Sequence, residues 1–481
     1  MQPEDSKRAP LIRPIRRDQL CWRSVDVERF IGTDHAARAI WEVVGRLNLS
    51  RYYDSIQCDK ERGGRPAIDP RLLISLWVYA YSEGIGSARE VERRCAWDPA
   101  FQWLTGCEVV NHHTLADFRV QQRQALDELF TQLLAMLSAE GLVTLAQVTQ
   151  DGTKIKALAA SKSFRRKKRI QQHLELARKK VQELSDPNAE PRSNRVEQVR
   201  QRAAQERQAR LERALAEVQT LQAQGRKPED ELRVSTSDPD ARQMKQPDGG
   251  YAPSYNVQIA TDVAHGFIVD VEVVQDGNDA EQLAPAVERV EQRMQACPQQ
   301  VLADGGYTNF RSVQTMAEQG VDFLGSWRDN TPTVDGQPFR YDEQQDCYFC
   351  PQGTQLQRVG RQSSRSGMIS IVYQAKWRQC QHCRLKAKCC PRNRVQGRGV
   401  LRDDDDSVVR AFREKMATAE AQEQYRRRGP VAEFRHAWIK SKLGLRQFHV
   451  RGLPKVQIEA IWACLTHNLQ QWIRLQRLQA A

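Results

Sequence analysis

The sequence predicts a mixed α/β domain that follows an all-helical N-terminal region and is interrupted by two insertions. Three observations lead to this fold class. Residues up to about 141 carry only helical signals, and from Val143 onward short apolar strands alternate with amphipathic helices. Two segments, one highly charged and one rich in cysteine, break that alternation. We therefore expect a helical domain at 1–141 and an α/β domain at 142–481, with insertions at 161–233 and 327–401.

Start and stop signals divide the N-terminal region into short helices. Asp69 and Asp98 each precede a proline, which places a capping side chain before a first-turn proline. Ser87 begins a capping box, and a leucine-rich face over 126–137 ends at Gly141. Short helices with tight joints are typical of a helix-turn-helix-like DNA-binding module, but a plain helical bundle explains the same pattern.

Five strands and several helices are expected in the α/β domain. The strands lie at 143–150, 255–260, 267–274, 300–303 and 322–324, with helices at 279–290 and 309–319 between them. Asp151 and Gly152 follow the first strand and indicate a turn there. Near the end, 410–442 and 456–475 are expected to be helical, and the apolar residues of the second segment recur at a helical period typical of a core helix.

The first insertion has the pattern of a helical hairpin. Apolar residues from Ile170 to Leu184 are spaced 4-3-4-3, which is a heptad seam, and a second seam runs from Leu211 to Leu221. A break with two prolines separates them, so an antiparallel coiled coil is expected, entered through the basic run 165–169.

The second insertion holds a candidate zinc site. Six of the twelve cysteines fall between Cys347 and Cys390. Cys347 with Cys350, and Cys380 with Cys383, form two pairs of the kind that close a tetrahedral thiolate site. Cys389 is an alternative ligand. Reduced thiols packed in a small β-unit are the other interpretation. A bound zinc would fold the insertion and take no part in catalysis.

Charge and hydropathy narrow the partners. There are 73 Lys and Arg against 60 Asp and Glu, a formal net charge of +13, which favours a polyanion such as nucleic acid but also suits a basic cytosolic protein. No apolar stretch approaches the roughly 20 residues that span a membrane. The first 20 residues are charged throughout, so we expect no secretory signal, no membrane partner and a cytoplasmic protein.

Acidic residues gather at one predicted edge of the sheet. Asp151 and Asp304 follow the first and fourth strands, and carboxylates at such an edge suit Mg²⁺, although Asp before Gly is also common in turns. A third acid, Glu433, shares a predicted helix face with His436 and Lys440. Arg428 lies near it as a natural phosphate ligand. Three other acids, Asp270, Asp276 and Asp279, compete with Asp304 for the second metal position, but Asp270 and Asp279 also suit a strand and a helix start.

These stretches carry a resemblance. Asp151-Gly-Thr-Lys-Ile-Lys-Ala, Ala303-Asp-Gly-Gly-Tyr and 425–440 resemble the DDE transposases of bacterial insertion sequences. The family's Tyr-Arg-Glu-Lys pattern falls on 425–440, with four residues between its Arg and Glu where the commonest form has three. The resemblance implies an RNase H-like catalytic domain. It also implies that Asp151, Asp304 and Glu433 are the catalytic, metal-binding triad, and that Tyr425, Arg428 and Lys440 contact DNA and its phosphates.

The resemblance also implies a function. Such a protein binds the terminal inverted repeats of its element, cleaves them and joins them to target DNA, using two Mg²⁺ or Mn²⁺ ions. Its partner is double-stranded DNA, on which a homodimer is expected, associated with the nucleoid. Two alternatives are a non-catalytic repressor or architectural protein descended from a transposase, and an RNase H-fold endonuclease without strand transfer.

Overall fold

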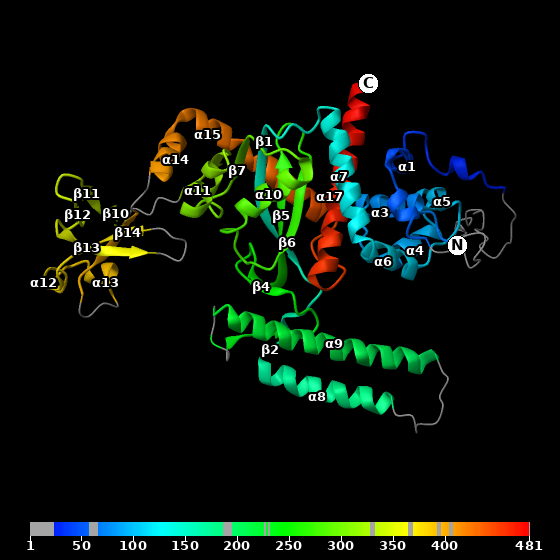
Figure 1. Cartoon of the computed structure of the whole chain (residues 1–481), viewed down its shortest axis with the longest axis horizontal. Helices are drawn as coiled ribbons and strands as arrows, with labels where there is room; N and C mark the ends of the chain where they lie inside the picture. The colour runs from blue at the N-terminus through cyan, green and yellow to red at the C-terminus, as the bar shows by residue number, and fades with distance from the viewer. Residues whose placement is uncertain are drawn as a thin grey trace, which may run out of the picture.

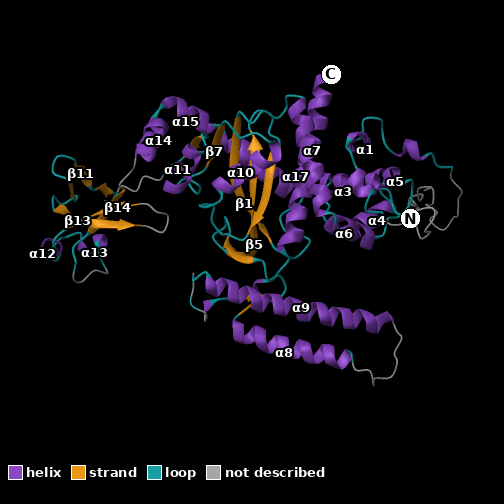
Figure 2. Cartoon of the chain, viewed as in Figure 1, coloured by secondary structure: helices purple, strands orange, loops and turns teal. Residues whose placement is uncertain are grey.

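The computed structural model describes residues 24–56, 66–185, 195–225, 228, 231–327, 332–363, 369–391, 396–403 and 407–480. A central sheet lies between the N-terminal helices on one side and a small β-unit on the other, and a pair of long helices projects below the sheet (Figure 1). Figure 2 shows that strands are concentrated in the central sheet and in the small β-unit. None of the described helices is long and apolar enough to cross a membrane.

The N-terminal region is helical, as the capping signals predict. Asp69 and Asp98 accept hydrogen bonds from the amides of Arg71 and Ala100, so both caps are confirmed. Ser87 precedes α4 but makes no side-chain cap bond. The helices are η1 (Val27–Phe30), α1 (Ala36–Arg46), α2 (Ser50–Tyr53), α3 (Pro70–Ser82), α4 (Ala88–Cys95), α5 (Pro99–Thr105), α6 (His112–Gln121) and α7 (Arg123–Ala139).

The central sheet combines antiparallel and parallel strands. Its strands are β1 (Gln147–Lys156), β4 (Arg242–Lys245), β5 (Tyr251–Asp262), β6 (Ile268–Val274), β7 (Gln300–Ala303) and β8 (Asp322–Gly325). β5 is antiparallel to β1, and both β6 and β4 are antiparallel to β5, whereas β7 is parallel to β1 and β8 is parallel to β7. Helices α10 (Leu283–Met294) and α11 (Phe310–Glu318) connect β6 to β7 and β7 to β8. β1, β6, β7 and β8 therefore all run in the same direction.

The first strand differs from its prediction. The Asp151-Gly152 pair does not end it: β1 continues to Lys156, and Gly152 pairs with Gln258 in the β1–β5 ladder. A Cβ atom at Gly152 would lie 2.5 Å from Asp279 Oδ1 and 2.6 Å from Gln258 Nε2. Glycine is required here because polar side chains approach the backbone closely, not because the chain turns.

One long helix joins the sheet to the N-terminal helices. In α17 (Leu453–Ala480), the predicted core residues Ile458, Ile461, Trp462, Leu465, Leu469 and Trp472 are all at most 3% exposed. On the sheet side, the Gln457 side chain bonds the backbone of β6 at Val271 and Val273. On the other side, the Trp462 indole donates to the carbonyl of Arg119 in α6. The N-terminal helices and the sheet thus share one hydrophobic core.

The first insertion is a helical pair fastened to the sheet at its base. Helices α8 (Lys167–Leu184) and α9 (Arg195–Ala223) bury the seam residues Ile170 and Leu174 against Leu211 and Val218. The predicted break falls mainly on 186–194, outside the described residues. The short strands β2 (Phe164–Arg165) and β3 (Val234–Ser235) pair with each other where the insertion begins and ends.

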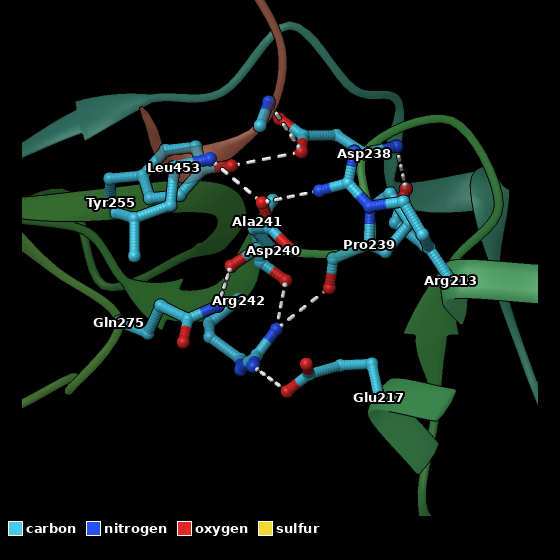
Figure 3. Close-up of polar contacts among 12 residues, drawn as sticks. Arg213, Glu217, Asp238, Pro239, Asp240, Ala241, Arg242, Tyr255, Gln275 and Leu453 are labelled. Carbon is cyan, nitrogen blue, oxygen red and sulfur yellow. Dashed lines mark hydrogen bonds and ion pairs between the residues drawn. The ribbon is translucent and has the colours of Figure 1, made fainter. Parts of the chain in front are cut away.

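A polar cluster fixes this base (Figure 3). Asp240 Oδ2 accepts from Arg213 of α9 at 3.0 Å and from the Leu453 amide, which begins α17, at 2.7 Å. Arg242 of β4 pairs with Glu217 of α9. Asp238 is fully buried and accepts from the Tyr255 hydroxyl at 2.9 Å. The helical pair is therefore held to both the sheet and the core helix.

The second insertion forms an antiparallel sheet with two short helices. The strands are β11 (Arg340–Asp342), β12 (Cys347–Phe349), β13 (Gln355–Ser363), β14 (Ile369–Gln374) and β15 (Gly399–Asp403), preceded by the pair β9 (Thr333–Val334) and β10 (Gln337–Pro338). The short helices are α12 (Trp377–Cys380) and α13 (Lys386–Cys389). Four helical segments then lead back to the sheet and α17: α14 (Ser407–Ala417), α15 (Ala419–Arg426), α16 (Arg428–Ala437) and the π-helical turn η4 (Trp438–Lys442).

Candidate active site

Two of the predicted acids lie side by side on adjacent parallel strands. The β1–β7 pairing ends with Gln150 opposite Ala303, so Asp151 and Asp304 each occupy the next position. The Asp151 side chain is 15% exposed. Burial raises the pKa of Asp151 to about 6, against the opposing charge of Arg428, and the negative charges of Asp304 and Asp279 add to the rise. These carboxylates therefore repel one another and favour a cation or a proton between them.

Helix α16 places cationic and aromatic groups over Asp151. Arg428 Nη1 donates to Asp151 Oδ2 at 3.2 Å, and His436 Nδ1 lies 4.0 Å from the same oxygen. Arg428 and His436 are eight positions apart, which puts them within about 80° of each other around the helix. Burial, with the charges of Lys440 and Arg428, lowers the pKa of His436 to about 4, so this imidazole is neutral at pH 7.

Lys440 adds a second cation to the site, and Tyr425 adds an aromatic ring beside Arg428. Burial lowers the pKa of Lys440, and the negative charge of Asp151 opposes that shift, which places the two groups within electrostatic range. The Arg428 guanidinium lies 5.8 Å from the centre of the Tyr425 ring. Burial raises the pKa of Tyr425, Arg428 opposes the rise and Asp304 adds to it. The four predicted residues Asp151, Arg428, Lys440 and Tyr425 therefore gather around one strand edge with Asp304.

Glu433 does not join this group. It is exposed on α16, and it makes no hydrogen bond or ion pair with any described residue. The reason is the rotation of α16: measured from Arg428, Glu433 lies about 60° further around the helix than His436, on the side away from β1. Across the described ranges, no three His, Cys, Asp or Glu side chains converge closely enough to hold a metal ion as they stand.

Asp279, which the sequence pattern explains as a helix start, lies in the structure close to Asp151. It lies beyond the end of β6, and its Oδ1 accepts from Asn256 and Gln258 of β5, each at 2.7 Å. Asp270, by contrast, is buried in β6 and pairs with Arg289 at 2.8 Å, which is a structural role. The direction of β6 is the signal that identifies Asp279, because a strand two antiparallel steps from β1 ends at the same sheet edge as β1.

The chemistry of these acids fits a hard divalent cation. Asp151 within β1, Asp304 directly after β7 and Asp279 in the segment that follows β6 offer carboxylate oxygens, and their mutual repulsion would be relieved by a positive charge. Arg428 supplies part of that charge in the structure. A second protein-bound ion would need Glu433 to turn toward this edge.

The cysteines of the second insertion gather without Cys347. Burial raises the pKa of Cys389 to about 11 and also raises that of Cys380; neighbouring thiols, Cys350 and Cys390 in both cases, add to the rise. Cys383 acts on Cys380 in the same way. Cys347 instead lies in β12, where its sulfur accepts from Gln355 Nε2 at 3.2 Å. Cys350 and Cys390 therefore lie within electrostatic range of Cys380 and Cys389, and Cys383 within range of Cys380, whereas Cys347 belongs to the strand; among the described residues no three of these thiols converge closely enough to hold a metal as they stand.

Comparisons with known proteins find two transposase families. Residues 349–473 match a family model described as a transposase DDE domain, and residues 25–121 match a second family model described as a transposase domain. No curated protein matches the chain. Among solved structures, a piggyBac transposase synaptic complex with hairpin DNA is similar at 10% identity and a TM-score of 0.32, over 90% of this chain and 73% of that one. Both matches are to transposase families, in chain order, and they support a DDE transposase of an insertion sequence.

Proposed function

We propose that this chain binds the ends of its insertion sequence, cleaves them and joins them to target DNA. The observation that carries the proposal is the placement of Asp151 and Asp304 on adjacent parallel strands, under a helix that presents Arg428 and Lys440. Carboxylates beside cations are what phosphodiester chemistry requires, because one set holds the metal and the other holds phosphate.

An RNase H-like core is part of the proposal. Its support is the order of the proposed catalytic acids along the chain: an Asp on β1, the first strand of the sheet, an Asp directly after β7, and a Glu on the later helix α16. We propose the domain division expected from the sequence, with the helical pair and the cysteine-containing β-unit as insertions. We propose that the N-terminal helices recognise the transposon ends, which the transposase-domain match at 25–121 supports.

The reaction assigns a task to each side chain. The proposed ligands of two Mg²⁺ or Mn²⁺ ions are Asp151, Asp304 and Glu433. Asp279 supports the ligands Asp151 and Asp304. Bound divalent ions would activate a water or a 3′-hydroxyl for in-line attack and stabilise the leaving oxygen. Arg428 and Lys440 bind the phosphates that flank the scissile bond, and Tyr425 contacts the adjacent nucleotide. Arg428 exchanges its contact with Asp151 for a phosphate, and Glu433 turns toward the edge as DNA enters.

We further propose one zinc ion in the second insertion. Cys350, Cys380 and Cys383 would supply three thiolates, and Cys389 would supply the fourth in place of Cys347, since Cys350, Cys383 and Cys389 each lie within electrostatic range of Cys380. The protein would act as a homodimer on DNA in the cytoplasm, since each of two ends needs an active site.

A supercoiled plasmid that carries the element's two ends tests the proposal. With Mg²⁺ and the full chain, we expect linear, excised and joined products. Nicks without joining would favour the RNase H-fold endonuclease, and end binding without any cut would favour the repressor or architectural protein.

A further inference from the structure

The apolar face of α16 is open. Val431, Phe434 and Trp438 recur at the spacing of a packing face, yet Phe434 is 48% exposed. Together with residues of α17, including His467 and Arg474, they line a cavity of about 390 Å³. That volume lies within the range of roughly 300–1,000 Å³ that is usual for small-ligand sites. A face with the sequence of a core is therefore left available to a ligand.

The cavity is aromatic on the α16 side. The Phe434 and Trp438 ring centres lie 5.4 Å apart with 32° between the ring planes, so two tilted aromatic rings adjoin on this side of the cavity. The Trp438 indole N–H is already bonded to Gln470 at 3.1 Å. What the pair offers a ligand is therefore π surface, which favours a flat ring over an aliphatic chain.

Two guanidinium groups border the same cavity. Arg435 lies 4.9 Å from the Phe434 ring centre and donates through Nε to the Gly266 carbonyl at 3.0 Å. Burial, with the positive charge of Arg474, lowers the pKa of Arg435. Neither arginine forms an ion pair with a carboxylate of the described residues. Like charges beside an apolar surface, with no anion between them, favour a phosphate.

A buried histidine adds an independent sign of a missing partner. His467 lines the cavity, is 3% exposed, and uses Nε2 to bond the Gly266 carbonyl at 3.2 Å. Its Nδ1 is buried and has no hydrogen-bond partner among the described residues. An acceptor left unsatisfied at such a site is unfavourable, and an N–H donor on a ligand would satisfy it.

We propose that this cavity binds one unpaired nucleotide of the DNA substrate. The base lies on Phe434 and Trp438, and the phosphate is held by Arg435 and Arg474. The combination of two adjoining aromatic rings, two cations and an N–H acceptor matches a nucleotide better than any single lipid or peptide group. The site lies on the side of α16 opposite His436, the residue 4.0 Å from Asp151, and we place in it a nucleotide of a strand that passes around α16 from the active site. That the nucleotide belongs to DNA rests on the proposed function.

Binding to labelled DNA in EDTA tests the proposal without any cleavage step. The probes are a fluorescein-labelled duplex of about 20 base pairs with a short thymidine overhang, the same duplex blunt, and the same overhang made abasic. We expect the full chain to prefer the thymidine overhang. Phe434→Ala and Arg474→Ala, both at exposed side chains, should each lower overhang affinity by about tenfold and leave blunt affinity within about twofold. A 5-bromouracil in the overhang should photo-crosslink to α16 or α17.

The controls separate this inference from others. Arg410→Ala removes the same charge from an exposed site on α14 and should affect all probes alike. Equal affinity for the three probes, or equal losses on all of them in Phe434→Ala, would overturn the proposal. So would a change of oligomeric state in Phe434→Ala with overhang binding intact, which would assign the face to a second copy. Overhang preference in a chain that never cleaves plasmid would refute the proposed transposition chemistry and leave the nucleotide site standing.

Discussion

The carboxylate of Asp279 lies in the space that a side chain at position 152 would need, with Oδ1 2.5 Å from the site of a Cβ atom. Asn256 and Gln258 hold that oxygen in place at 2.7 Å each. Gly152 follows Asp151 directly, so the same glycine that lets the strand continue also brings a third acid to the sheet edge. The Asp-Gly pair thus has a function in acid placement that its turn propensity concealed.

Gly152→Ala should therefore disturb the site through Asp279. We expect a loss of about 1–3 kcal/mol in the free energy of unfolding, because overpacking forces the polar side chains apart. Mg²⁺-dependent plasmid cleavage should fall with it. Urea unfolding and a cleavage assay measure the two effects. Gly360→Ala is the matched control, since Gly360 also lies in a strand and has no atom within 4 Å of its Cβ position. An unaltered Gly152→Ala protein would contradict the close approach.

The carboxylates should separate by role. Asp151→Asn, Asp304→Asn and Glu433→Gln should each abolish cleavage and keep DNA affinity within about threefold, because basic contacts to phosphate persist. Asp279→Asn should lower cleavage by roughly 10- to 100-fold, the loss typical of a group that supports metal ligands.

Glu281→Gln, at an exposed acid beside α10, is the control and should cleave normally. Single-turnover cleavage at several Mg²⁺ concentrations makes the comparison. Recovery of the Asp279→Asn cleavage rate at high Mg²⁺ would show that Asp279 helps the other acids to hold the metal. Full activity in Glu433→Gln would remove Glu433 from the triad.

Much of this site could be predicted because it depends on local pattern. The strand pattern predicted Asp151 and Asp304 at one edge, and the resemblance added Arg428 and Lys440. In the structure Asp151 and Asp304 follow the paired residues Gln150 and Ala303, Arg428 lies 3.2 Å from Asp151, and Lys440 lies within electrostatic range of Asp151. What could not be predicted depends on packing between distant segments. The exposure of Glu433 follows from which face of α16 meets β1, and a helical period alone leaves that rotation open.

The sequence also did not predict that the N-terminal helices and the sheet share one hydrophobic core. Helical N-terminal residues and a later α/β pattern suggest two separate cores, yet α17 is packed on both, through Gln457 on β6 and Trp462 on α6. The apolar period of α17 signals burial but does not name its neighbours, and its buried polar residues, among them Gln457, Glu459 and Asn468, give no such signal. The same limit applies to Cys347, because two Cys pairs at equal spacing do not reveal which thiol is turned into a strand.

Stability should fall as pH falls through the range set by His467. Burial lowers the pKa of this imidazole from 6.5 to about 4 in the folded chain, so the unfolded chain binds the proton first. The penalty begins below about pH 6.5 and is complete near pH 4. Between pH 7 and pH 5 it amounts to about 2 kcal/mol for a single such group.

Urea unfolding at the two pH values measures this term. His467→Gln should show a smaller loss of stability on acidification than the unaltered chain. His113→Gln, at an exposed position, should match the unaltered chain and serves as the control. An equal acid sensitivity in all three proteins would mean that His467 takes up its proton normally in the folded state.

Zinc content should distinguish the two candidate ligand sets. Elemental analysis of the purified chain should give about one zinc per molecule, since a small polar β-unit gains folding free energy from a closed metal site. Cys350→Ser, Cys380→Ser and Cys383→Ser should each lower that content, because Cys350 and Cys383 lie within electrostatic range of Cys380. Cys347→Ser is the matched control: its sulfur is bonded to Gln355 in a strand, so zinc should stay bound. Loss of zinc in Cys347→Ser alone would restore the ligand set expected from spacing.

A zinc-free protein that folds, binds DNA and cleaves it with Mg²⁺ alone would leave all of these cysteines as packed thiols. Because the insertion leads through α14 and α15 into α16, loss of zinc should also reduce cleavage by misplacing Arg428 and Glu433.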